Sequence, residues 1–267
     1  MSTCEFPSLA GRAVWPLRLA SAALWIIGLG VLLVALSGPL TRLGVVKFGP
    51  GLMTLAGGGA LLAIGILTGA IGWIGAAAKR VPIQTGAVAA ALVVALLLFG
   101  YLLLQLVRAF GVPPIHEIST DLADPPAFVA IRAIRAEIPG VNPVEYVAEQ
   151  KSNNERGSLN VPDVQRQSYP DIQPLVLQAS PAEAFARAER VARELGWEIQ
   201  ESAPAEGRLE ATATTTFFGF KDDVVVRVRS AGAGSRVDVR SKSRVGLGDA
   251  GANAKRVRAF LAAMQQN

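Results

Sequence analysis

Three long apolar spans without a charged residue fill the first part of the chain, and they limit what it can fold into. Residues 19–41, 48–78 and 81–107 form these spans, and each is bounded by basic residues: Arg18, Arg42, Lys47, Lys79, Arg80 and Arg108. A helix crosses the bilayer core with about 20 apolar residues. The spans therefore predict transmembrane helices at about 19–41, 50–77 and 83–107, within a membrane anchor formed by residues 1–111.

The composition of the spans argues against transport. No Asp, Glu, Lys, Arg or His lies inside them, whereas ion paths and proton relays through membranes usually contain such residues. In the Gly-rich second span, Gly65 and Gly69 are four residues apart, so they share a face and allow another helix to approach closely. Cys4, the single cysteine of the chain, precedes the first span and is interpreted as a free thiol.

The basic residues also predict an orientation. The positive-inside rule compares Lys and Arg near the helix ends on the two sides of the membrane. One side has four of them and the other side has three, namely Arg12, Arg18, Lys79 and Arg80 against Arg42, Lys47 and Arg108. This bias favours a cytoplasmic N-terminus and a C-terminal domain on the periplasmic side of a bacterial inner membrane.

The positive charge of the chain belongs to the anchor. The whole chain has a net charge of +5, and residues 1–111 contribute +6 while residues 112–267 contribute −1. Nucleic-acid binding needs a basic stripe on the folded domain. No nucleic-acid partner is therefore expected, and the lipid bilayer is the expected partner of the anchor.

The remaining residues predict a soluble α+β domain. Residues 112–174 form a Pro-rich juxtamembrane segment, with a short helix expected near 126–136 and a mobile loop over 149–167. Residues 175–267 form the expected core, since alternating and helical patterns follow one another in the order strand, helix, four strands, helix. Ser180-Pro181-Ala182-Glu183 forms a capping box, and Asp249 is placed to cap the last helix. An antiparallel sheet with two helices packed on one face buries every apolar face.

The last hairpin permits a prediction of register. If residues 231–234 form the loop, Val228 faces Val237 and Val226 faces Val239, all toward the helices. The other face then carries seven basic and two acidic side chains: Lys221, Arg227, Arg229, Arg236, Arg240, Lys242, Arg244, Asp223 and Asp238. This face could bind an anionic ligand, lie open to solvent, or be covered by residues 112–202, which have a net charge of −6.

Several motifs resemble those of one family. They are Pro114–Asp121, Pro125–Phe128, Tyr169–Ile172, Gly219–Asp223, Ser241–Gly246 and the residues Asp249, Gly251, Asn253 and Ala254. In this order, over about 112–265, they resemble the domain-of-unknown-function family numbered 1499. The resemblance implies a bacterial envelope protein, lipid-anchored or membrane-spanning, with no assigned activity. The family pattern near His116 is similar to Ile-Asn/His-Asp-Ile, from which Glu117 departs.

Few residues of the soluble part are candidates for catalysis or metal binding. His116 is the only histidine, so a His-rich metal site is excluded, and neither a metal nor a cofactor is expected. The adjacent carboxyl groups of Asp222 and Asp223 could share acid–base work, or pair with Lys242 and Lys221. Phe217-Phe218-Gly219-Phe220 forms an aromatic hairpin tip that either fills the core edge or touches a lipid or a partner.

The turn after residue 241 is the best candidate site. Backbone N–H groups at a helix N-terminus can hold an anion there, although Arg244 and Asp249 could instead form a buried pair that Asn253 braces. The candidate binding residues are Lys221, Asp222, Asp223, Ser243, Arg244, Asp249 and Asn253.

The sequence thus favours a membrane-anchored, non-catalytic binding or interaction module, whose partner is another envelope protein or an anionic ligand. The alternative is a hydrolase or transferase that uses Asp222, Asp223, Arg244 and Asp249 on an anionic or lipid-like substrate. A third possibility is a structural subunit whose Gly-rich helices assemble with other membrane proteins.

Overall fold

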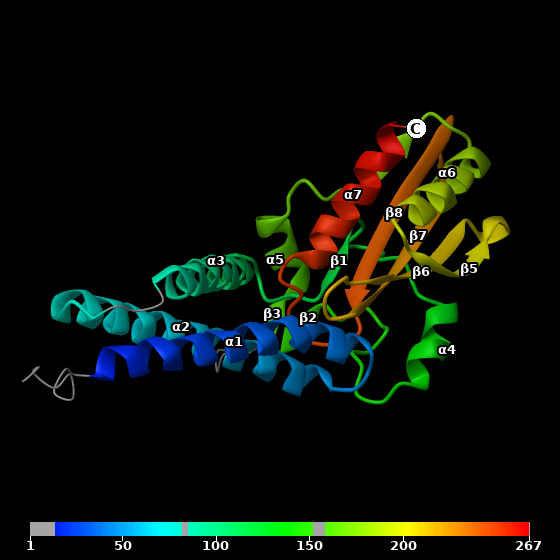
Figure 1. Cartoon of the computed structure of the whole chain (residues 1–267). Helices are drawn as coiled ribbons and strands as arrows, with labels where there is room; N and C mark the ends of the chain where they lie inside the picture. Colours follow the sequence, from blue (N-terminus) through cyan, green and yellow to red (C-terminus); the bar gives the residue numbers. More distant parts are fainter. Residues whose placement is uncertain (1–13, 82–84, 152–157, 267) are drawn as a thin grey trace, which may run out of the picture. The chain divides into compact units, whose positions relative to one another are not determined.

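The computed structural model describes residues 14–81, 85–151 and 158–266, and it divides into two compact units, Met1–Leu106 and Val107–Asn267 (Figure 1). The predictions for Cys4 and Arg12, and the predicted start of the third helix at residue 83, lie outside the described residues. Each unit is described by itself below.

The first unit consists of long apolar helices. They are α1 (Trp15–Arg42), α2 (Phe48–Lys79) and α3 (Thr85–Phe110), the last of which continues into the second unit. All three are long and apolar enough to cross a membrane. Their bounds extend a few residues past the predicted spans at the ends that the structure describes.

Glycines spaced seven residues apart on α2 let it pack closely against α1. A Cβ atom on Gly58 would lie 3.0 Å from the carbonyl oxygen of Gly30, and one on Gly72 would lie 2.9 Å from the backbone nitrogen of Ala20. Gly65 faces Ile27 of α1, while Gly69 lies against Ala23 of α1 and Leu92 of α3. The expected close approach at Gly65 and Gly69 is therefore present, as is typical of helix pairs in membranes.

The second unit is built on a six-stranded antiparallel sheet. The strand order is β1-β8-β7-β6-β5, and β4 also pairs with β8. The strands are β1 (Glu117–Ser119), β4 (Leu175–Leu177), β5 (Glu198–Ala203), β6 (Arg208–Thr214), β7 (Lys221–Ala231) and β8 (Gly234–Ser243), and the 3₁₀ turn η2 (Pro204–Glu206) links β5 to β6. The α+β architecture is as predicted.

The helices α6 (Pro181–Glu194) and α7 (Ala252–Gln266) lie together on one face of this sheet (Figure 1). Between them and the strands lies the main core, which includes Val226, Val228, Val237 and Val239. The predicted capping box starts α6, since the Ser180 backbone N–H donates to Glu183 at 2.9 Å. Val228 pairs with Val237 and Val226 with Val239, so the predicted register is confirmed. The loop is shorter than assumed, because Ala231 and Gly234 already pair.

The opposite face is covered by the Pro-rich segment. This segment contributes β1 and α4 (Ala130–Ala136), with a small second core of Phe128, Ile131, Val144 and Val225. A mobile loop over 149–167 was expected, but the described part contains β2 (Glu149–Lys151) paired with β3 (Ser158–Asn160), then α5 (Val161–Ser168). Residues 152–157 of that prediction lie outside the described residues.

Candidate functional site

Asp223 is the centre of the first buried ion cluster on the covered face. Its carboxylate accepts from Nε of Arg135 at 2.6 Å, and from Nη2 and Nε of Arg244 at 2.7 and 2.9 Å. The hydroxyl of Thr212 also donates to it, at 2.8 Å. Burial alone would raise the pKa of Asp223, but hydrogen bonds and charges from the two arginines prevail and lower it. The carboxylate is therefore a fully bonded anion.

The predicted pair of Arg244 and Asp249 is wrong. Arg244 follows β8 beside the start of β7, where its backbone N–H donates to Lys221, and its side chain reaches Asp223 instead. Asp249 accepts from the backbone N–H groups of Gly251 and Asn253 at 2.8 and 2.9 Å. It therefore caps the start of α7, as predicted. Burial raises the pKa of Asp249.

Glu117 is the centre of a second buried cluster. Its carboxylate accepts from Nζ of Lys242 at 2.9 Å and from Nε of Arg240. The predicted pairing of Lys242 with Asp223 is thus wrong, although the two residues are opposite one another in the β7–β8 register. Burial lowers the pKa of Lys242, against the raising effect of Glu117. Arg240 also lies over the ring of Phe128, 4.8 Å from its centroid.

A third cluster covers the end of the face near the β7–β8 turn. Asp121 accepts from Arg236 at 2.7 Å, and Asp124 accepts from Arg227 and Arg229, each at 3.1 Å. Together the three clusters occupy most of the basic face. Of the three interpretations, cover by the acidic part of the chain is the one that the structure supports.

Asp222 and Asp223 cannot work as paired carboxylates, because successive side chains of a strand point to opposite faces. Asp222 accepts from Nη2 of Arg256 on α7 at 2.6 Å, whereas Asp223 bonds to α4 on the other face. The predicted pair of Asp222 or Asp223 with Lys221 is also absent among the described ion pairs, and Lys221 is exposed.

Asn253 and Ser243 join a buried network beside Asp222. The amide Nδ2 of Asn253 donates to the carbonyl of His116 at 3.1 Å and to the hydroxyl of Ser243 at 2.9 Å. Its Oδ1 accepts from Ser241 at 2.6 Å and from Arg256 at 2.7 Å. Burial, and then the charge of Lys242, lower the pKa of His116, whose Nδ1 has no partner in the described residues. The predicted site residues therefore divide between two internal networks, apart from exposed Lys221.

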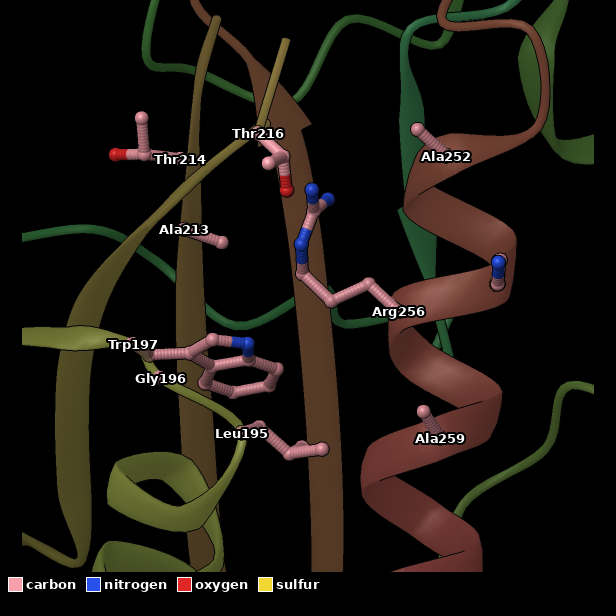
Figure 2. Close-up of a pocket in the computed structure, with 10 residues that line it drawn as sticks. Leu195, Gly196, Trp197, Ala213, Thr214, Thr216, Ala252, Arg256 and Ala259 are labelled. Carbon is pink, nitrogen blue, oxygen red and sulfur yellow. The ribbon is translucent and has the colours of Figure 1, made fainter. Parts of the chain in front are cut away.

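An accessible hollow of about 410 Å³ lies beside this network, between α7, the α6–β5 turn and the end of β6. Figure 2 shows the Arg256 side chain extending from α7 toward the strands, with the Trp197 ring beside it. Trp197 stacks on Phe260 with centroids 5.2 Å apart, which fixes the ring as a wall. Lys255 is exposed and has no ion pair among the described residues. Thr214 and Thr216 add hydroxyl groups.

Sequence reasoning missed the residues of this hollow. None of the candidate binding residues predicted from the sequence lines it, whereas Trp197, Lys255 and Arg256 do. Helical spacing against the buried Ala254 and Val257 could have placed the two cations at the helix edge. The other half of the hollow comes from β6 and the α6–β5 turn, and no local pattern brings these segments together.

The comparisons with known proteins now give the family. A family model described as a protein of unknown function (DUF1499) matches residues 117–264, more than half of the chain. The chain belongs to the DUF1499 family. No curated protein matches it. The DUF1499 match starts at β1 and ends within α7, so it includes both the covering segment and the sheet. No group of three or more potential metal ligands occurs among the described residues of the chain.

Proposed function

We propose that this chain is a bacterial inner-membrane protein that holds its DUF1499 domain in the periplasm as a non-catalytic binding module. Three apolar helices and the family of unknown function support membrane anchoring in general. The finer location rests on the basic residues near the helix ends, four against three, which favour a cytoplasmic N-terminus.

We further propose that the module binds an organic anion in the hollow beside Trp197. The observation that carries this proposal is the contrast between internal networks whose charges are already paired and one exposed, unpaired cation in a concave site. The volume of about 410 Å³ suits a small ligand. The indole ring would pack against an apolar part of the ligand, while Lys255 and the two threonine hydroxyls would bind an anionic head group.

Lys255 gives the clean test, because Arg256 is bound to Asp222, Ser241 and Asn253 and its loss would disturb the fold. Full-length protein in nanodiscs is titrated by calorimetry with naphthalene-2-sulfonate, and with neutral naphthalene-2-methanol for comparison. We expect binding of the sulfonate, loss of that binding in Lys255→Ala, and retention in Lys221→Ala, which removes an exposed lysine outside the hollow. Equal binding of the two compounds, or an unaffected Lys255→Ala variant, would contradict the proposal.

The hydrolase or transferase alternative requires Asp222, Asp223, Arg244 and Asp249 around one substrate. Asp222 and Asp223 face opposite sides of the sheet, and Asp223 is 0% exposed. The geometry therefore favours binding over this catalytic arrangement. Assembly with another envelope protein stays a prediction.

A further inference from the structure

Three loops meet at one end of the soluble unit's sheet. They are residues 111–116 before β1, 214–221 between β6 and β7, and 245–251 between β8 and α7, and we call them the tip end. Strand pairing places them together: Glu117 is opposite Lys242, and Thr214 is opposite Lys221. The Lys221 carbonyl also accepts from Arg244, and the Ile115 carbonyl accepts from Asp249.

The tip end exposes apolar side chains on two separate loops. Phe217 is 44% exposed and Leu247 is 46% exposed. Phe217 meets Phe218 edge to face at 5.0 Å, and Phe218 stacks on Phe220 at 5.1 Å. The rings thus pack against one another within the turn, and Phe217 stays exposed. Phe and Leu are typical of the apolar faces of segments that lie in the interface between membrane and water.

The charge of the tip end also fits a membrane surface. Lys221 is exposed at its edge. Asp249 is the single acidic residue in the three loops, all of which the structure describes, and its two oxygens accept from Gly251 and Asn253. No free carboxylate in these loops would therefore repel anionic lipid headgroups, and an exposed lysine near such headgroups is attracted to them.

The chain enters the domain at this same end. The third apolar helix ends at Phe110, and a Cβ atom on Gly251 would lie 3.5 Å from the side chain of Val112. Likewise, a Cβ atom on Gly248 would lie 3.3 Å from Pro114. The third apolar helix thus ends only a few residues before the segment that contacts the loop carrying Leu247.

We infer that the tip end rests on the bilayer that the chain's own helices span, with Phe217 and Leu247 in the interfacial layer and Lys221 facing anionic headgroups. This inference rests on the membrane anchoring proposed above, and it does not depend on a ligand in the hollow. The soluble unit would then contact the membrane surface directly, rather than being connected to the membrane by a flexible linker alone.

Full-length protein carrying Cys4→Ser gives a background for single labels. A polarity-sensitive nitrobenzoxadiazole probe is attached at Phe217→Cys or Leu247→Cys in nanodiscs of phosphatidylcholine and phosphatidylglycerol with brominated acyl chains. Ala233→Cys, in the exposed turn at the opposite end of the sheet, is the matched control. Leu97→Cys, which is 70% exposed on α3, reports on the anchor itself.

We expect a blue shift and quenching by brominated lipid at residues 217, 247 and 97, and neither at 233. Adding Lys221→Glu to Leu247→Cys should weaken the quenching at 247. If the probe at 97 is quenched while that at 217 resembles that at 233, the inference is overturned and the anchoring stands. If the probe at 97 is not quenched, the proposed anchoring itself fails.

Discussion

Removal of the Asp223 carboxylate should be among the most damaging single changes to the soluble unit. Asp223→Ala leaves two guanidinium groups without their anion, on side chains that are 3% (Arg135) and 9% (Arg244) exposed. Breaking a buried pair by removing one partner costs about 3–5 kcal/mol. Because the two pairs share one carboxylate, their costs are not additive. We therefore expect a loss of about 5 kcal/mol from a total that is typically about 5–15 kcal/mol.

The same helix supplies a matched control. Arg132 precedes Arg135 by one turn of α4, and it pairs with Glu145 at 2.7 Å with side chains 58% and 54% exposed. Exposed pairs contribute about 0–1 kcal/mol. Arg132→Ala should therefore leave stability almost unchanged. Arg135→Ala should lower it clearly, because Asp223 then retains one of its two arginine partners, Arg244.

Urea unfolding of a fragment spanning residues 112–267 measures these differences, because Trp197 is its only tryptophan. With a slope of about 1–3 kcal/mol per M, a loss of about 5 kcal/mol lowers the midpoint by about 2–5 M. The combined change Arg135→Met, Asp223→Leu and Arg244→Met removes all three charges, and it should recover much of the loss. Equal midpoints for Asp223→Ala and Arg132→Ala would refute the reasoning.

Three further predictions test location, autonomy and pH response. A reporter that is active only after export, fused after Asn267, should be active; a fluorescent cytoplasmic reporter with an inactive export reporter at that position would reverse the orientation. The fragment 112–267 should be soluble and unfold cooperatively, while 175–267 should unfold at a lower temperature because it lacks Glu117 and Arg135; identical thermal midpoints would show that the cover adds nothing. The pKa of His116 is lowered by burial, so the unfolded chain binds the additional proton, and stability should fall as pH drops below about 6.5. His116→Asn should flatten this part of the stability curve, measured between pH 5 and 7, and an unchanged slope would assign the effect to another group.

Local sequence patterns were sufficient to predict much of the fold. Charge-free apolar spans predicted the long helices, and the alternation of valines with polar residues predicted the β7–β8 register. The Ser180–Glu183 capping box and the Asp249 cap were also predictable, because each joins groups within four residues of each other. These features depend on neighbours in sequence, or on one hairpin whose turn fixes its register.

The candidate site was less predictable, because its partners are distant in the chain. Arg135 and Asp223 are 88 residues apart, and Glu117 and Lys242 are 125 residues apart. Opposite charges in register suggested a pair of Asp223 with Lys242. Each instead pairs with a residue on the covering segment or at the strand end, where opposite charges and further hydrogen bonds offset the cost of burial. Nothing in the periodicity of a Pro-rich segment signals such contacts.

The basic face also explains how an irregular segment can be buried at all. Buried carbonyl groups need hydrogen-bond donors, and a Pro-rich chain cannot supply them through a regular ladder. Here two sheet residues supply several of them: Arg240 donates to the carbonyls of Pro126 and Val144 at 3.0 and 2.8 Å, and Lys242 donates to that of Glu145 at 2.6 Å. Arg135 of α4, within the segment itself, donates to the carbonyl of Asn142 at 3.0 Å. The cations thus bind the protein's own chain. We therefore propose that binding be sought at the hollow beside Trp197 and at the tip end rather than on the basic face.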